Sequence, residues 1–495
     1  MLLAQGLPSS SGRTVGRDQY LNIEDTNVDL DLDAIPTHPL GIKPLGNQYL
    51  ATGPTARRSL GPLGILPDEL ILHLADYLDA PSLRGLASTC RFLFGFGQLD
   101  DLWKSLFLES HHNIAPAPTW RGSWRNTFLG LETGQGARID CGNVYSDVLH
   151  RPFACSHINL KKHIRNIPAQ NLIAHLDDLD FDEFSASWSN RPFILTKSID
   201  SWPVLREWTI AGLQRNYSQV SFRAEAVDWP MSVYSAYMSH SKDESPLYLF
   251  DKAFAEKMHV QVGKGGLYWP PDCFGPDLFA LLGKERPAHR WLIVGPERSG
   301  STFHKDPNAT SAWNAVVEGS KYWIMFPPSA QVPGVYVSED SSEVTSPLSI
   351  AEWLLEFHAE AREQPGCVEG ICRAGEILHV PSGWWHLVVN LEPGIALTQN
   401  FVPKSHLADV LSFLRDKPDQ VTGFKKDIEN PYELFVSRLQ DQHPELLEEA
   451  LQDLDRRSQN KKRKWEEATK PIEENGVAGG GFSFGFGGDS DDEIP

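Results

Sequence analysis

The chain has 495 residues, which is too long for one ordinary hydrophobic core, so we expect two or three folded units. A hydrophobic content of 41% with 15 tryptophans is ample for globular domains, whereas a formal net charge of −20 argues against nonspecific binding to nucleic acid or to an anionic membrane. The same charge favours a basic partner, such as a Lys/Arg-rich or histone-like protein.

The six cysteines form no CxxC pair and no regular framework, which is typical of reduced thiols inside the cell. The first residues lack a positively charged region and a long apolar run, and no segment is long enough to span a bilayer. We therefore expect a soluble protein of the nucleus or the cytoplasm.

Residues 1–62 mix Gly, Pro and Ser with an acidic and apolar stretch from Asn22 to Ile35, and they show no sustained periodicity. This composition predicts a disordered leader. The alternative for the acidic stretch is a docking peptide.

Residues 63–130 have the apolar spacing of short helices and predict a small all-α domain. Pro67 suits the first helical position, and Asp68 and Glu69 would lie at the positive end of the helix dipole. The predicted apolar positions of three successive helices are Leu70, Ile71, Leu74, Tyr77 and Leu78, then Leu83, Leu86, Ala87, Cys90 and Leu93, then Leu102, Trp103, Leu106 and Phe107.

The pattern LPDEL…YLDAPSLRGLASTCRFL…LWKSLF resembles an F-box. The resemblance implies a three-helix module that docks on the Skp-type adaptor of cullin ubiquitin ligases. The alternative is a helical bundle that only caps the fold. Residues 131–165 are predicted to be a linker, and the basic run Lys161 to Arg165 within it is interpreted as a solvated face.

The strongest metal-site pattern is formed by His304, Asp306 and His386. Residues i and i+2 of a strand point to one face, so the first two can reach the same ion while Lys305 points away. Two imidazoles and one carboxylate leave open coordination positions, as in the facial triad of non-haem Fe(II) oxygenases. Because an isolated HxD is common by chance, its surroundings decide the interpretation.

The segments around these three residues predict short strands with turns between them. An apolar segment follows Asp306, then a turn at 318–320, then a strand at 321–327. The segment VPSGWW precedes His386, and an alternating run after it ends in the turn at Pro393-Gly394. This arrangement is typical of an antiparallel barrel.

The motifs HKD, AWN, GSKYWIMFP, VPSGWWHLVVNL and IALTQNF occur in an order and spacing that strongly resembles the Jumonji-C (JmjC) oxygenases, in particular the phosphatidylserine-receptor-like branch of lysyl hydroxylases and arginine demethylases. The resemblance covers residues 166–405. It implies an α+β multidomain protein in which a double-stranded β-helix (cupin or jelly-roll) barrel with flanking helices follows the F-box.

The same resemblance implies Fe(II) held by His304, Asp306 and His386, with 2-oxoglutarate and O2 as cosubstrates. Lys321 would bind the far carboxylate, Thr398 would donate a hydroxyl, and Ser301 stands where relatives commonly have threonine. The implied contacts to 2-oxoglutarate are Ser301, Asn314, Lys321, Thr398, Tyr248 and Asn400. Taken singly, the lysine and the threonine could be ordinary strand residues, and His379 is interpreted as a structural histidine.

Residues 406–456 have helical spacing, and such helices in JmjC relatives often form a dimer, so we expect a homodimer through them. Residues 457–495 are predicted to be a disordered tail with a basic cluster at Lys461 to Lys464. This cluster is either a nuclear-import signal or a solvated charge run.

The predicted function is Fe(II)- and 2-oxoglutarate-dependent hydroxylation of protein side chains, foremost lysyl, with demethylation of N-methyl Lys or Arg as a variant of the same chemistry. The alternative is an F-box substrate receptor of a cullin ubiquitin ligase, in which the barrel serves recognition. A cupin-type sugar isomerase or storage barrel is disfavoured because the Lys/Thr pair suits a dicarboxylate.

Overall fold

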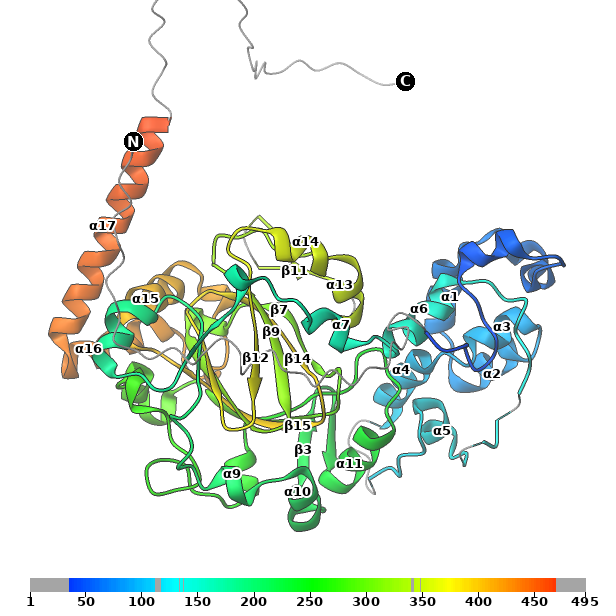
Figure 1. Ribbon diagram of the computed structural model, residues 1–495, viewed down its shortest axis with the longest axis horizontal. Helices are drawn as coiled ribbons and strands as arrows, with labels where there is room; N and C mark the ends of the chain where they lie inside the picture. The colour runs from blue at the N-terminus through cyan, green and yellow to red at the C-terminus, as the bar shows by residue number, and fades with distance from the viewer. Residues whose placement is uncertain are drawn as a thin grey trace, which may run out of the picture.

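The structure is a computed structural model in which two β-sheets pack against each other, with helices around them and a helical N-terminal unit to one side (Figure 1). It describes residues 35–111, 117–132, 134–136, 138–339, 342–347 and 349–468. The acidic stretch from Asn22 lies outside the described residues except for its last residue, Ile35. The glycine-rich segment at 469–495 also lies outside them.

The larger sheet has nine strands in the order β1-β2-β13-β8-β15-β6-β5-β3-β4, and the smaller has four in the order β12-β9-β14-β7. The strands are β1 Ala174–Leu176, β2 Phe193–Leu195, β3 Ser221–Ala224, β4 Val227–Pro230, β5 Leu249–Asp251, β6 Arg290–Gly295, β7 Gly300–His304, β8 Ser311–Glu318, β9 Ser320–Phe326, β10 Tyr336–Val337, β11 Val344–Thr345, β12 Val368–Arg373, β13 Ile377–Val380, β14 Trp385–Asn390 and β15 Gly394–Phe401. Strands β10 and β11 form a separate small ribbon.

The chain crosses repeatedly between the two sheets, which confirms the predicted cupin-type fold. Strand β8 belongs to the large sheet and β9 to the small one, and they are joined at Gly319, whose φ of 83° suits glycine. Strands β13, β14 and β15 alternate in the same way. Buried apolar side chains from both sheets, including Trp323, Leu378 and Val388, fill the space between them.

The helices cover the outer faces and form the N-terminal unit. They are α1 Asp68–Asp76, α2 Ala80–Ala87, α3 Arg91–Phe96, α4 Asp100–His111, α5 Trp124–Leu129, α6 Asp147–Ser156, α7 Leu160–Ile164, α8 Phe181–Glu183, α9 Val204–Glu207, α10 Ile210–Tyr217, α11 Met231–His240, α12 Phe254–Lys257, α13 Ile350–Glu356, α14 His358–Glu363, α15 Leu407–Asp416, α16 Pro431–Gln442 and α17 Pro444–Ala468. In the described part of the chain no helix is long and apolar enough to cross a membrane.

Helix α1 differs from its prediction. Pro67 is the N-cap and not the first helical residue. Ile71 and Ala75 are buried, whereas Leu70, Leu74 and Tyr77 are 49%, 54% and 77% exposed. The predicted apolar face is therefore split, because the fold covers the side that carries Ile71 and Ala75 and leaves Leu70 and Leu74 exposed.

The N-terminal helices and the large sheet share one continuous core. Trp103 and Trp124 belong to the same buried cluster as Trp229 and Tyr237. The indole Nε1 of Trp124 donates to Asp243 Oδ2 at 2.9 Å. The helical unit is thus held firmly against the sheet.

Three predicted boundaries were wrong. Residues 35–62 are not a disordered leader, because they form short 3₁₀ helices at Leu45–Leu50 and Ala56–Ile65, and Leu60 is buried. The predicted linker contains α6 and α7, and helix α17 continues past residue 456 to Ala468. The apolar residues that anchor these segments are irregularly spaced along the sequence. Because they follow neither the helical nor the strand period, the sequence pattern did not indicate that these segments fold.

Candidate metal centre

Two adjacent strands of the small sheet carry the histidines. His304 ends β7, His386 lies in β14, and the two residues are directly paired across the ladder. Their ring centroids are 4.1 Å apart. The backbone of Asp306 stays extended although strand pairing ends at His304, so its side chain returns to the same face.

The three side chains converge as a metal site requires. One ligand atom from each of His304, Asp306 and His386 lies within 4.8 Å of the other two. The Nδ1 atoms of the two rings lie 2.8 Å from Thr302 O and 3.1 Å from Trp384 O. Since a carbonyl only accepts, each Nδ1 must donate, which leaves Nε2 with a lone pair for a metal.

The donor set fits a divalent transition metal. Asp306 Oδ2 is buried without a hydrogen-bond partner, and burial raises the pKa of this carboxyl while His304 lowers it. Burial, reinforced by the neighbouring ring of His304, holds the pKa of His386 well below its ordinary value. A cation at this point would stabilise the ionised carboxylate of Asp306. It would also require neutral imidazoles, which the lowered pKa of His386 provides. Fe(II) accepts such a mixed set of nitrogen and oxygen ligands.

Lys321 is a buried ammonium group in β9 of the small sheet. It is 2% exposed and donates from Nζ to Tyr248 Oη at 2.6 Å and to Asn390 Oδ1 at 2.7 Å. Burial lowers the pKa of Lys321 to about 7. Both partners are neutral, so an anionic ligand would find an uncompensated cation here.

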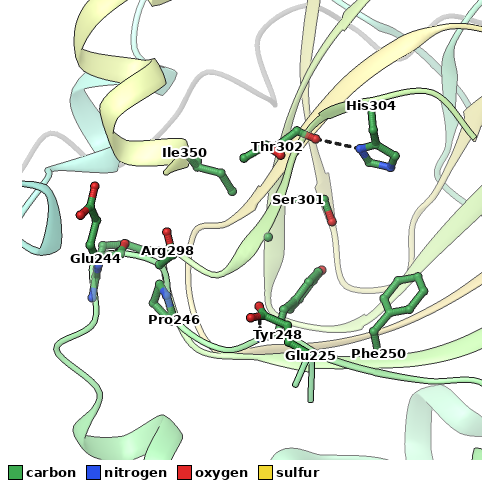
Figure 2. Close-up of a pocket in the computed structure, with 12 residues that line it drawn as sticks. Glu225, Glu244, Pro246, Tyr248, Phe250, Arg298, Ser301, Thr302, His304 and Ile350 are labelled. Carbon is green, nitrogen blue, oxygen red and sulfur yellow. Dashed lines mark hydrogen bonds between the residues drawn. The ribbon is translucent and has the colours of Figure 1, made fainter. Parts of the chain in front are cut away.

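A cavity of about 460 Å³ opens beside these groups. Figure 2 shows its lining, with Ser301 between Tyr248 and His304, and Glu225 beside Tyr248. Glu225 Oε1 accepts from the backbone N–H of Tyr248 at 3.0 Å. The cavity is large enough for a small cosubstrate and the end of a side chain.

The remaining predicted residues lie on two paired strands of the large sheet. Thr398 in β15 is directly opposite Asn314 in β8, and its hydroxyl donates to Trp313 O at 2.9 Å. Asn314 Oδ1 is buried without a partner. The amide of Asn400 favours the ionised form of Asp306, so this residue lies beside the metal ligands.

Asn390 and Thr302 were not among the predicted site residues. Asn390 fixes Lys321 and in turn donates to Ser299 Oγ at 2.9 Å, and Thr302 orients His304 through its carbonyl. Asn390 is a polar residue in the apolar run VVNL. A polar residue in such a run indicates a functional or hydrogen-bonding role, so this pattern could have identified it. His379, as predicted, is structural, being buried among aromatic rings with Nδ1 3.4 Å from Arg191 O.

A cupin-type pair of sheets, a two-histidine and one-carboxylate cluster and a buried lysine together define a metal-dependent oxygenase. Residues 181–406 match the family model of the cupin-like domain, and residues 63–109 match that of the F-box-like domain.

Named relatives agree with this class. The chain is 37% identical over 431 residues to the arginine-specific demethylase JMJ22 of Arabidopsis thaliana, covering 84% of each protein. It is 35% identical over 298 residues to the bifunctional arginine demethylase and lysyl-hydroxylase psr-1 of Caenorhabditis elegans, covering 57% of this chain and 71% of the relative. It is 31% identical over 150 residues to the 2-oxoglutarate and iron-dependent oxygenase JMJD4 of Danio rerio, covering 28% of this chain and 32% of the relative. The chain belongs to the JmjC-domain family and is an iron- and 2-oxoglutarate-dependent oxygenase with an F-box-like domain.

Proposed function

We propose that this oxygenase holds Fe(II) with His304, Asp306 and His386 and oxidises a C–H bond of a lysine or arginine side chain in a protein substrate. The observation that carries the proposal is the buried, unpartnered carboxylate oxygen of Asp306 beside two imidazoles that each present Nε2. Iron and 2-oxoglutarate supply the oxidation, in which the cosubstrate loses CO2 to become succinate and one oxygen atom of O2 passes to the substrate.

The chain's own residues bind and orient the reactants. Lys321 receives the far carboxylate of 2-oxoglutarate, and Tyr248 and Asn390 hold its ammonium group in place. Thr398 and Asn314 offer polar atoms from the opposite sheet, and Ser301 offers a hydroxyl from the cavity wall.

A basic side chain is the proposed substrate. Glu225 brings a carboxylate to the same cavity as His304, and an acidic group there would attract an ammonium or guanidinium group. Hydroxylation of a lysyl carbon and N-demethylation share one step, because a hydroxylated N-methyl group is a hemiaminal that loses formaldehyde. We propose lysyl hydroxylation as the primary activity, with arginine or lysine demethylation as the related outcome.

The test is succinate formation by the Fe(II)-loaded chain supplied with O2, 2-oxoglutarate and Lys/Arg-rich peptides. We expect turnover by the wild type, loss of at least about a hundredfold in His304→Ala, and no loss in the control His240→Ala, which alters an exposed histidine. A peptide mass gain of one oxygen identifies hydroxylation, and loss of a methyl group identifies demethylation. Turnover that survives in His304→Ala would contradict the assigned ligand.

A second proposed function is docking on a Skp-type adaptor through the F-box-like helices. It rests on Leu70, Leu74 and Tyr77, which are exposed on one helix although they are apolar. We expect Leu74→Glu to abolish capture of the purified adaptor, and Leu355→Glu to leave it unchanged, because Leu355 is 53% exposed on a different helix. If both variants are captured equally, this face is not the docking surface.

The adaptor would make the protein a substrate receptor as well as an enzyme. A receptor that uses the oxygenase domain only for recognition would support ubiquitin transfer to a bound target even when His304 is changed to alanine, so this variant separates the two functions.

We also propose that the cluster Lys461 to Lys464 directs nuclear import. The test is the cellular location of a fluorescent fusion in which these residues are changed to glutamine. A homodimer through α15 to α17 stays a prediction, to be tested by light scattering.

A further inference from the structure

Three arginines from separate helices of the N-terminal unit gather around a second cavity, away from the metal centre. Arg84 lies in α2, Arg91 begins α3, and Arg125 lies in α5. They line a cavity of about 570 Å³ together with Trp103, and none of the described residues that line it is Asp or Glu. The charged side chains that line this cavity are therefore all positive, in a chain of net charge −20.

No carboxylate of the described residues lies within ion-pair distance of these guanidinium groups, although Asp100 attracts Arg125 at longer range. Within the described residues none of the three forms an ion pair, although the chain has 65 acidic residues. The contact of Arg91 is the neutral amide of Asn143, at 3.2 Å. Arg84 repels Arg125 electrostatically, and both charges persist because arginine stays protonated.

Arg125 is the most confined of the three. Its guanidinium carbon lies 5.7 Å from the centroid of the Trp103 ring, and its Nε is buried without a hydrogen-bond partner. Asp100, the carboxylate that attracts Arg125, forms no ion pair with it and accepts instead from the backbone N–H groups of Trp124 and Arg125 at 2.9 and 2.8 Å. A buried donor without an acceptor is costly, and an anion in the cavity would satisfy it.

We propose that this arginine pocket, defined by Arg84, Arg91 and Arg125, binds an acidic peptide segment, and that residues 24–33 of the same chain are its occupant. Guanidinium groups are matched to the planar carboxylates of Asp and Glu, and Trp103 offers an apolar floor. A long polyanion such as RNA fits less well, because the net charge of −20 would repel it while one concave pocket admits only a few groups.

The position of the N-terminus supports this occupant. The described chain begins at Ile35, and Pro36 lines a neighbouring cavity that shares Gln98 with the arginine pocket. The ten residues 24–33 carry five acids, Glu24, Asp25, Asp29, Asp31 and Asp33. Extended chain covers about 3.3 Å per residue, so a segment of ten residues has an extended length of about 33 Å.

The test measures binding of a fluorescent peptide with the sequence of residues 22–35. The receptor is the full chain in which these five acids are changed to the corresponding amides, so that its own segment does not compete. We expect binding that weakens at high salt and at least a tenfold loss of affinity in Arg84→Gln/Arg125→Gln. The control Arg206→Gln/Arg215→Gln removes two exposed arginines elsewhere and should leave the affinity unchanged.

Further variants keep the result interpretable. Arg84→Gln/Arg91→Gln alters two exposed side chains and should lose affinity as well, without loss of thermal stability. Wild-type chain should bind the peptide several-fold more weakly than the amide chain, because its own segment fills the pocket. If the pocket variants and the control variant bind the peptide equally, the arginine pocket is not the binding site. If the wild-type chain and the amide chain bind the peptide equally, residues 24–33 do not occupy the pocket. These readouts do not depend on oxygenase activity.

Discussion

Lys321 is the residue that we propose to select the cosubstrate. A buried ammonium group with two neutral partners is costly by itself, and the cost is offset when a carboxylate binds. We expect Lys321→Ala to raise the KM for 2-oxoglutarate by about thirty-fold or more, since removing one partner of a buried charge pair costs about 2 kcal/mol or more. Steady-state kinetics at saturating peptide would measure it.

The control for this substitution is Lys284→Ala, because Lys284 is an exposed lysine outside the barrel. Its KM for 2-oxoglutarate should equal that of the wild type. A Lys321→Ala enzyme with an unchanged KM would show that another cation receives the far carboxylate.

The pKa of Lys321 also predicts a pH dependence of cosubstrate binding. Burial lowers this pKa to about 7 in the free protein, so the lysine is charged below pH 7 and loses its proton above it. Since the dianion needs the charged lysine, the Kd for 2-oxoglutarate should be flat below pH 7 and rise about tenfold per pH unit above it. Anaerobic calorimetry on the metal-loaded protein would measure this slope.

Lys321→Arg provides the matched comparison, because arginine stays charged over this range. Its Kd should show no rise between pH 7 and 9, even if the longer side chain weakens binding overall. The same slope in both proteins would assign the pH effect to a different group.

At the scale of elements, the pairing of β7 with β14 sets the distance between the two histidines. Gly300 lies in β7 so close to β14 that a Cβ there would be 2.0 Å from Val388 O. We expect Gly300→Ala to force the strands apart, to cost about 1 to 3 kcal/mol of folding free energy, and to weaken Fe(II) affinity. Chemical denaturation and metal titration would measure the two effects.

Gly85→Ala is the control, because a Cβ at Gly85 in α2 meets nothing within 4 Å. There the change should be neutral or stabilising by about 0.5 to 1 kcal/mol, as expected for alanine in a helix. If Gly300→Ala behaved like this control, the close strand approach would not be needed for the metal centre.

At the scale of the whole molecule, the N-terminal helices and the oxygenase domain share one buried core, and we expect them to unfold as one cooperative unit. Trp124 is fully buried in the core that both share, and it donates a hydrogen bond to Asp243 in the oxygenase domain. We expect Trp124→Ala to cost about 3 to 5 kcal/mol and to lower the Tm of both parts together. Differential scanning calorimetry would test for one transition in the wild type.

The comparison is Trp291→Ala, because Trp291 is only half-buried in β6. It should cost less, since less apolar surface is lost. Two separate transitions in the wild type, with only one of them shifted by Trp124→Ala, would contradict a shared core.

Much of the site could be predicted from the chain without its structure. The ligands His304, Asp306 and His386 were predicted because their chemistry is specific and because HxD in extended chain places two ligands on one face. Lys321 and Thr398 followed from their motifs. Asn390 was missed, because its role depends on contact with a lysine on a neighbouring strand, and strand pairing is a long-range property.

The amino-acid sequence alone was sufficient for the class of β-fold and the existence of the N-terminal helices, because both depend on local periodicity. It also predicted three candidate metal ligands from their side-chain chemistry, and the structure brings these side chains together. Only the tertiary structure decided which face of α1 stays exposed, that residues 35–62 and 131–165 fold, and that Arg84, Arg91 and Arg125 meet. A periodic pattern identifies an apolar face of a helix but not which element packs against it. Like charges that are distant in sequence come together only when the helices that carry them pack.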